Sequence, residues 1–401
     1  MTRSEKNDKK NNMKLAFLPD ELESFCLEAS KFADYIAIDT EFVRHNTYYA
    51  KVCLIQIAFK TANKKKILLI DPLEQGVNLD PLKKLLKDKN TLKIMHAGRQ
   101  DLEIFLNLFD CLPTPFFDTQ IAAMICGMGE QEGYESLVKN LLGQQVNKEC
   151  QFTNWGKRPL SNEQIKYATE DVTYLCDVYE VLRNKLQVLG RSDWVTEELE
   201  KLTDRRNYDN IAANSLKKIK GVNGSTNFKL SVVELVSFRE QIAQELNLPR
   251  NHVIKDSILL KLARQLPQTI SSLKEFDIFS TKIDSTIYLK KLIAICRNLR
   301  LKEKQRPSLS DNFRQEENIL GIMGLLKSLL KIKSSELNLP PKLIASIKDL
   351  EMIASQDKPD VIALKGWRKT IFGLDALKLK KGEIALTICK DQIVKIDLKV
   401  K

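Results

Sequence analysis

The sequence predicts an α/β domain in the first half of the chain and helical domains in the second half. Three apolar runs with short polar turns between them precede residue 71, and this pattern is typical of an antiparallel meander. Helical and strand patterns then alternate, so we expect one mixed sheet with helices on its faces. Helical patterns dominate beyond residue 228. The expected early elements are strands at 35–42, 52–59, 67–70 and 92–95 and helices at 81–87 and 99–109.

Length and composition are those of a globular protein with two or three domains. The chain has 401 residues, of which 43% are hydrophobic and 29% charged. No apolar run approaches the roughly 20 residues that span a bilayer, and residues 1–14 are polar and basic. The eight cysteines never form a C-x-x-C pair and mostly sit in apolar segments, as reduced thiols do. We therefore expect a disordered leader at 1–14 and a cytoplasmic monomer that binds no membrane.

The positive charge lies in the second half of the chain. Residues 1–200 carry 26 Lys and Arg against 30 Asp and Glu, whereas residues 201–401 carry 38 against 22. This division favours a catalytic domain joined to domains that bind a polyanion. The alternative is that lysine-rich helices simply present soluble faces.

Two carboxylates follow the first buried strand pattern. Asp39 and Glu41 are two positions apart, so on a strand their side chains leave the same face. Close carboxylates raise each other's pKa unless a cation lies between them. The pair therefore indicates divalent-metal ligands or an acid dyad, unless the strand runs out into solvent and both are surface acids.

A third carboxylate, Asp101, lies in the first turn of the helix expected at 99–109. Alone it would be an acidic residue that complements the helix dipole. His96, at the end of the preceding strand, would by itself be a packed or capped histidine rather than a ligand.

The fourth carboxylate, Asp171, belongs to a later helix. Ser161 and Gln164 form a capping-box pattern, so this helix should begin near Asn162. Tyr167 and Asp171 are four positions apart and share a mainly apolar face. A buried carboxylate on such a face needs a partner, because an unpaired buried charge is costly.

The three segments together predict one metal site formed by Asp39, Glu41, Asp101 and Asp171. Oxygen ligands without histidine or thiolate suit Mg²⁺ or Mn²⁺. Two such cations held by carboxylates hydrolyse phosphodiesters. The free pKa of a tyrosine is about 10, so Tyr167 is a poor general base at neutral pH. We expect it to orient the attacking water or the scissile phosphate.

These segments resemble the three exonuclease motifs of the ribonuclease D family, the tyrosine-bearing branch of the DEDD exonucleases. The resemblance covers about residues 15–195, and the motifs in this order and spacing are specific. It implies a ribonuclease H-like fold for a domain at 15–200, and two bound divalent cations. It also implies 3′-to-5′ trimming of tRNA precursors and other small structured RNAs, with release of nucleoside 5′-monophosphates. The segments that carry it are Ile38–Phe42, Thr47–Tyr48, Leu54–Gln56, His96 with Arg99–Asp101, and Tyr167 with Asp171.

By the family motifs, Asp39, Glu41, Asp101 and Asp171 are metal ligands. Tyr167 is by the same motifs the residue that orients the water.

The second half contains an internal repeat. After a polar segment interpreted as a linker at 201–227, Glu-Leu-Asn-Leu-Pro at 245–249 recurs 91 residues later, at 336–340. The repeat predicts two tandem helical domains, at 228–302 and 310–401. They resemble HRDC domains, which implies nucleic-acid binding, although the second copy could instead serve only for packing. Alternating residues near the C-terminus predict a hairpin of 384–388 and 392–398.

Aromatic and basic residues near the motifs are candidate RNA contacts. Phe42, Tyr48 and Tyr49 follow the first motif and would stack on the terminal bases. Trp155 and Arg158 precede the third motif and would meet the RNA backbone. Each is as readily interpreted as a core residue.

Three functions remain open from the sequence. The first is a metal-dependent 3′-to-5′ exoribonuclease, the second a catalytically silent RNA-binding protein, and the third a DNA-directed exonuclease of the same fold. The complete carboxylate set argues against the silent protein. No Walker A pattern is present, so the sequence encodes no nucleotide-driven motor of that kind.

Overall fold

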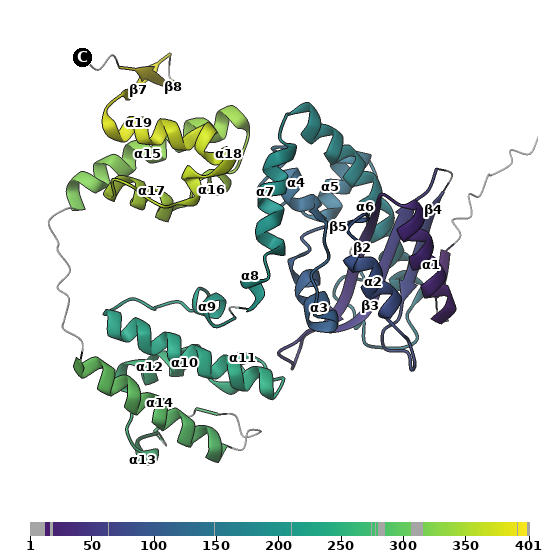
Figure 1. Cartoon of the computed structure of the whole chain (residues 1–401), viewed down its shortest axis with the longest axis horizontal. Helices are drawn as coiled ribbons and strands as arrows, with labels where there is room; N and C mark the ends of the chain where they lie inside the picture. The colour runs from purple at the N-terminus through teal and green to yellow at the C-terminus, as the bar shows by residue number, and fades with distance from the viewer. Residues whose placement is uncertain are drawn as a thin grey trace, which may run out of the picture.

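The first half of the chain forms one six-stranded sheet with helices packed on it (Figure 1). The computed structural model describes residues 13–398 apart from 17–18, 63, 148, 210, 274, 277, 280–284, 306–315 and 391. The strand order is β1-β4-β3-β2-β5-β6, with β3 antiparallel to β2 and β4, and β5 parallel to β2. The predicted meander and mixed sheet are confirmed. The strands are β1 (Met13–Ala16), β2 (Tyr35–Val43), β3 (Lys51–Lys60), β4 (Lys65–Ile70), β5 (Leu92–Met95) and β6 (Phe116–Asp118).

Helices cover both faces of this sheet. Tyr35 and Ala37 of β2 cluster with Val172 of the long helix α6, whereas Ile36 and Ile38 pack into the opposite core with α2 and α3. This alternation along one strand separates the two cores. Helix α3 has the predicted bounds, and α6 begins where the capping box predicts. The helices are α1 (Pro19–Phe32), α2 (Asp80–Lys87), α3 (Arg99–Phe109), α4 (Thr119–Ile125), α5 (Tyr134–Leu142) and α6 (Asn162–Val188).

The prediction of a disordered leader at 1–14 is wrong at its C-terminal end. Met13 and Lys14 belong to β1 and pair in parallel with Ile67 and Leu68 of β4. β1 therefore satisfies the backbone groups that β4 would otherwise expose as the sheet edge. A four-residue strand carries too little periodicity to be recognised in the sequence. Residues 1–12 lie outside the described residues.

The segment predicted as a linker is also partly helical. α7 (Ser192–Thr203) extends into it, and α8 (Arg206–Asp209) and α9 (Ile211–Leu216) lie within it. The hydroxyl of Tyr208 donates to the backbone carbonyl of Leu202 at 2.8 Å, so α8 is fastened to the end of α7. The interpretation of 201–227 as a linker is therefore wrong up to the end of α9 and again at 226–227, where α10 (Thr226–Glu245) begins.

Two groups of helices and a hairpin make up the second half (Figure 1). We call residues 226–305 the first helical module and residues 316–381 the second. The predicted hairpin is confirmed as β7 and β8. The first module contains α10 (Thr226–Glu245), α11 (Arg250–Val253), α12 (Asp256–Gln265), α13 (Ile270–Leu273) and α14 (Ser285–Gln305). The second contains α15 (Glu316–Leu337), α16 (Pro341–Ile344), α17 (Ile347–Ser355), η2 (Ile362–Leu364), α18 (Gly366–Arg368), η3 (Lys369–Gly373) and α19 (Leu374–Lys381), followed by β7 (Ile384–Cys389) and β8 (Gln392–Asp397).

The repeated Glu-Leu-Asn-Leu-Pro segment forms the same turn in both modules. Asn247 has a φ of 49° and Asn338 a φ of 52°, a left-handed conformation that asparagine tolerates better than most residues. Each asparagine follows the long first helix of its module and precedes a short helix. The repeat in the sequence is therefore also a repeat in the structure.

In the first module this turn contacts the loop between β2 and β3. The Asn247 side-chain oxygen accepts hydrogen bonds from the backbone N–H groups of Tyr48 and Tyr49, at 3.0 and 3.1 Å. The Tyr48 hydroxyl donates to Glu240 at 2.8 Å, and the guanidinium of Arg250 lies 4.6 Å from the centre of the Tyr48 ring. The first module is thus attached directly to the loop that follows β2.

In the second module the same turn contacts the end of α4. The Asn338 side chain donates to the Gly127 carbonyl at 2.9 Å, and Arg191 donates to the Leu337 carbonyl at 3.0 Å. Trp194 of α7 stacks on Trp367 with ring centres 4.6 Å apart. The second module therefore has an extensive packing role against the nuclease half.

Among the described helices, none has the length and apolar character needed to cross a bilayer.

Candidate active site

Strand β2 presents Asp39 and Glu41 on the sheet face that α6 covers. The apolar residues before them are fully buried, which fixes the orientation of the strand. Asp39 and Glu41 point in the same direction because one residue separates them. A register shift between Glu41 and Phe42 then interrupts the pairing with β3, which resumes where Phe42 pairs with Val52.

Helix α6 brings Tyr167 and Asp171 over that face. The Ser161 side chain accepts from the Gln164 N–H and the Gln164 side chain accepts from the Ser161 N–H, so both halves of the predicted capping box are present. Asp171 is 7% exposed. Tyr134 of α5 donates its hydroxyl to the backbone carbonyl of Asp171, which holds this turn of α6 in place.

Helix α3 brings Asp101 to the same cavity. Asp118, a buried residue that the sequence analysis did not single out, accepts hydrogen bonds from the N–H groups of Ala97 and Gly98, at 3.2 and 2.9 Å. These bonds shape the turn into α3, where Ala97 has a φ of 52°. The Thr40 hydroxyl donates to the Asp101 carboxylate at 2.5 Å, which links α3 to β2.

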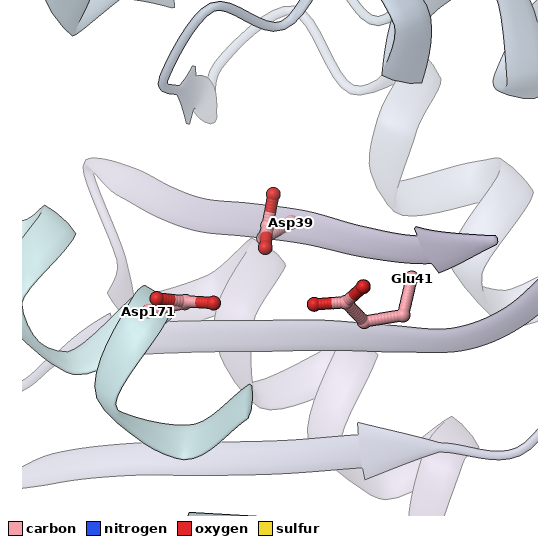
Figure 2. Close-up of side chains that lie close together, drawn as sticks. All are labelled: Asp39, Glu41 and Asp171. Carbon is pink, nitrogen blue, oxygen red and sulfur yellow. The ribbon is translucent and has the colours of Figure 1, made fainter. Parts of the chain in front are cut away.

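The side chains of Asp39, Glu41 and Asp171 converge from β2 and α6 (Figure 2). One carboxylate oxygen of each lies within 4.8 Å of the other two. Asp101 is outside this group of three but lines the same cavity of about 550 Å³. The lining residues are Asp39, Thr40, Glu41, Phe42, His96, Ala97, Gln100, Asp101, Gly133, Tyr134, Glu135, Val146, Gln151, Phe152, Tyr167, Asp171 and Leu175.

The pKa of each of the four carboxyl groups is raised. Burial raises the pKa of Asp39 well above its usual value, and Asp171, Asp101 and Glu41 raise it further by repulsion. Burial followed by repulsion from Asp171 and Asp101 raises the pKa of Glu41 to about 9. Burial also raises the pKa of Asp171 to about 7 and that of Asp101 to about 6. The ionised cluster is therefore unfavourable without a counter-charge.

This donor set fits a divalent cation. The converging groups are carboxylates, and the lining residues named above include no lysine or arginine to neutralise them. Oxygen-only coordination is what Mg²⁺ and Mn²⁺ prefer. His96 also lines the cavity, but its Nδ1 lies 3.0 Å from the Thr119 hydroxyl and burial lowers its pKa to about 4. His96 is therefore a neutral, packed histidine, as the sequence predicts, and not a metal ligand.

Tyr167 lines the cavity beside Asp171. Its hydroxyl forms a hydrogen bond with the Asp171 carboxylate, and burial raises its pKa above the usual value. Its ring lies 6.0 Å from that of Trp155, centre to centre. The hydroxyl therefore stays protonated at neutral pH and is available for hydrogen bonding, as the sequence analysis expects.

The comparisons with known proteins agree with this geometry. Residues 16–187 match the model of a 3′-5′ exonuclease family, and residues 232–296 match the HRDC domain. Ribonuclease D of Jannaschia sp. is 40% identical over 378 residues, which cover 94% of this chain and 97% of that protein. The chain belongs to the ribonuclease D family.

Other members extend the likeness. Ribonuclease D of Granulibacter bethesdensis is 38% identical over 368 residues, or 90% of each chain. The crystal structure of Escherichia coli RNase D superposes with a TM-score of 0.77 at 28% identity, and the match covers 92% of this chain and 99% of that one. The predicted family, the fold class of the nuclease domain and the first HRDC domain are confirmed. The HRDC character of the second module remains a prediction that depends on the internal repeat.

The five residues predicted to contact RNA lie in different environments in this ribonuclease D family member. Phe42 lines the carboxylate cavity. Tyr48 is 3% exposed and Trp155 is 1% exposed, so neither ring is free to stack on a base. Tyr49 packs beside Tyr48 against the first module. Arg158 is ion-paired with Asp71.

We therefore correct the prediction for the two buried residues, Tyr48 and Trp155, which are core residues and not RNA contacts. Tyr49 and Arg158 are only partly buried, so their contact with RNA stays a prediction beside the structural contacts that they make. Arg158 donates to both oxygens of Asp71 and, at 2.6 Å, to the carbonyl of Cys53. The guanidinium thereby fastens the loop before α6 to β3.

Phe152 is a cavity-lining residue that no motif in the sequence singles out. This side chain is 91% exposed although it lines the carboxylate cavity. Its loop is held from both sides, because Gln164 donates to the Thr153 hydroxyl at 3.0 Å and that hydroxyl donates to the Cys150 carbonyl at 2.8 Å. A ring exposed on an anchored loop at the rim of the cavity is a candidate base-stacking surface. A lone phenylalanine in a polar loop gives no such signal in the sequence.

Proposed function

We propose that this chain is a metal-dependent 3′-to-5′ exoribonuclease that releases nucleoside 5′-monophosphates. The observation that carries the proposal is the convergence of Asp39, Glu41 and Asp171 in one cavity that Asp101 and Tyr167 also line. Membership of the ribonuclease D family supports the same reaction. The E. coli protein is described as an exoribonuclease involved in structured RNA processing, which supports an RNA substrate here.

The residues of the chain have distinct roles in this proposal. Asp39, Glu41, Asp101 and Asp171 would hold two divalent cations, Mg²⁺ or Mn²⁺. When bound, these would generate the nucleophile at neutral pH and stabilise the leaving 3′ oxygen. The oxygen of water joins phosphorus as the bond from phosphorus to the 3′ oxygen breaks, so a nucleoside 5′-monophosphate leaves and a new 3′ hydroxyl remains. The protonated hydroxyl of Tyr167 orients the attacking water or the scissile phosphate.

The rest of the chain would select and hold the RNA. We propose that its substrates are tRNA precursors and other small structured RNAs, and that the basic second half holds their phosphates. On this view the nuclease domain extends from β1, which begins at Met13, to about residue 200. Residues 228–302 and 310–401 are two nucleic-acid-binding domains. We also propose that the protein acts as a monomer in the cytoplasm.

The test is a 3′-tailed RNA and a DNA of the same sequence, each incubated with purified protein and Mg²⁺ or Mn²⁺. We expect stepwise loss of 3′ nucleotides from the RNA, which a chelator and the Asp39→Asn substitution both abolish. RNA binding without trimming under either metal would identify a catalytically silent RNA-binding protein. Faster trimming of the DNA would identify a DNA-directed exonuclease.

Replacing Tyr167 by phenylalanine should slow turnover far more than it weakens RNA binding. The variant loses only the hydroxyl, and a single oriented hydrogen-bonding group contributes roughly 10²-fold to turnover. Single-turnover rates at saturating RNA measure this effect separately from binding. Tyr174→Phe is the matched control on α6, because Tyr174 is not among the cavity-lining residues. A fully active Tyr167→Phe variant would contradict the proposed role.

Replacing Phe152 by alanine should raise the KM for RNA. Stacking of one base on an aromatic ring contributes about 1–3 kcal/mol, so we expect KM to rise roughly 5- to 150-fold with kcat nearly unchanged. Phe32→Ala is the control, since Phe32 is 62% exposed and is not among the cavity-lining residues. An unchanged KM for Phe152→Ala would show that the exposed ring is not used for binding.

A further inference from the structure

The side chain of Gln56 is buried beside the carboxylate cluster without a hydrogen-bond partner. Gln56 lies in β3 between β2 and β4, and its exposure is 0%. Neither Nε2 nor Oε1 of its amide contacts a partner among the described residues. Buried polar groups are nearly always hydrogen-bonded, so an amide with both ends unpaired calls for an explanation.

Gln56 and Asp39 are direct partners across the strands β2 and β3. The side chains of such a pair leave the same face of the sheet, and their Cβ atoms lie about 4.5–5.5 Å apart. On this face Leu54 and Ala58, the neighbours of Gln56 two positions away, pack with residues of α6. The amide therefore lies under the helix that supplies Asp171, on the same side of the sheet as the carboxylates.

In the described part of the chain, Asp39 lacks a side-chain hydrogen-bond donor, and the Gln56 amide is a donor that lacks an acceptor. The carboxylate of Asp101 receives a hydrogen bond from the Thr40 hydroxyl, and that of Asp171 from Tyr167. Among the described residues, no side chain donates a hydrogen bond to the Asp39 carboxylate. The Thr40 backbone N–H donates to it, and this hydrogen bond lowers the pKa of Asp39. Metal-ligating carboxylates are typically held in place by hydrogen bonds from neighbouring groups.

We propose that Gln56 is a positioning residue for the metal site. When a divalent cation is bound, the Gln56 Nε2 amide donates to the Asp39 carboxylate and holds Asp39 in the orientation that ligates the cation. This inference rests on the proposed metal-dependent function and extends it to a residue that does not itself touch the cation or the RNA.

The substitution that tests this is Gln56→Met, because methionine has nearly the shape of glutamine but no hydrogen-bonding amide. Two opposite effects are expected. Mn²⁺ binding, measured by calorimetry without RNA, should weaken about 10- to 100-fold, the usual effect of losing such an outer hydrogen bond. The thermal midpoint in EDTA should stay equal or rise, because an unsatisfied buried amide has been removed. Gln56→Leu is a second variant with the same expectation.

Leu69→Met is the matched control, since Leu69 is the partner of Gln56 on β4 and is equally buried. It should leave Mn²⁺ affinity unchanged and lower the midpoint only slightly, as a volume-conserving core substitution does. Unchanged Mn²⁺ affinity in Gln56→Met, or an equal loss in Leu69→Met, would overturn the proposal. RNA trimming by the wild type is measured in parallel: absence of trimming with the affinity difference intact would refute the proposed function and leave the role of Gln56 standing.

Discussion

Asp171→Asn is expected to lose RNA trimming by roughly 10³-fold or more, as removal of a residue from a cooperating catalytic set usually does. Asparagine has the shape of aspartate but lacks the negative charge that holds a cation. The same substitution should not destabilise the metal-free protein. Burial raises the pKa of Asp171 to about 7, so above neutral pH its ionised form repels Asp39 and Glu41. A neutral amide removes that repulsion.

Single-turnover trimming at saturating Mn²⁺ measures the first effect and thermal unfolding in EDTA measures the second. Glu170→Gln is the matched control, because Glu170 is the neighbour of Asp171 on α6 but is not among the cavity-lining residues. It should retain nearly full activity. If Asp171→Asn lost activity only in proportion to a lower thermal midpoint, the carboxylate would be a structural residue and not a ligand.

The parts of the site that could be predicted from the sequence are those that depend on local periodicity. Asp39 and Glu41 share a face because any strand alternates its side chains, and Tyr167 and Asp171 share a face because any helix turns every 3.6 residues. The capping box marked the start of α6 for a similarly local reason. These patterns bring the carboxylates onto defined faces, and the three motifs in order then indicate a common site.

The contacts that could not be predicted join residues far apart in the chain. Tyr48 follows the first motif directly, which made it a plausible RNA contact, but its hydroxyl donates to a glutamate 192 residues later, Glu240. Glu240 is 3% exposed and is also bound by Arg250 at 2.8 Å. No local pattern distinguishes a tyrosine that meets RNA from one that meets another module of the same chain.

The interface around Tyr48 joins the first module to the loop that borders the active site. The loop that it contacts begins directly after β2, the strand of Asp39 and Glu41. Within that loop the guanidinium of Arg44 donates to the Tyr48 carbonyl at 2.7 Å. The HRDC domain therefore supports the loop next to the cavity.

Without metal, the protein should lose stability as pH rises from about 6.5 to 8. The pKa of Asp171 is raised to about 7 and that of Glu41 to about 9, whereas both are near 4 in the unfolded chain. Between these values the folded protein holds protons that the unfolded chain has released, so raising the pH favours unfolding. Each proton held in this way lowers the free energy of unfolding by about 1.4 kcal/mol per pH unit.

Thermal unfolding at pH 6.5 and pH 8, in EDTA and in Mn²⁺, tests this expectation. Two groups oppose this trend only at the ends of the window: His96, whose pKa is lowered from about 6.5 to about 4, near pH 6.5, and Lys93, whose pKa is lowered to about 8, near pH 8. Mn²⁺ should raise the midpoint more at pH 8 than at pH 6.5, because a cation supplies the charge that the ionised cluster lacks. Asp171→Asn, with one carboxyl fewer, should lose less stability over the same interval in EDTA. A midpoint in EDTA that stays level or rises from pH 6.5 to 8 would mean that the carboxylates are not close enough to repel one another, and the metal site would lose its physical basis.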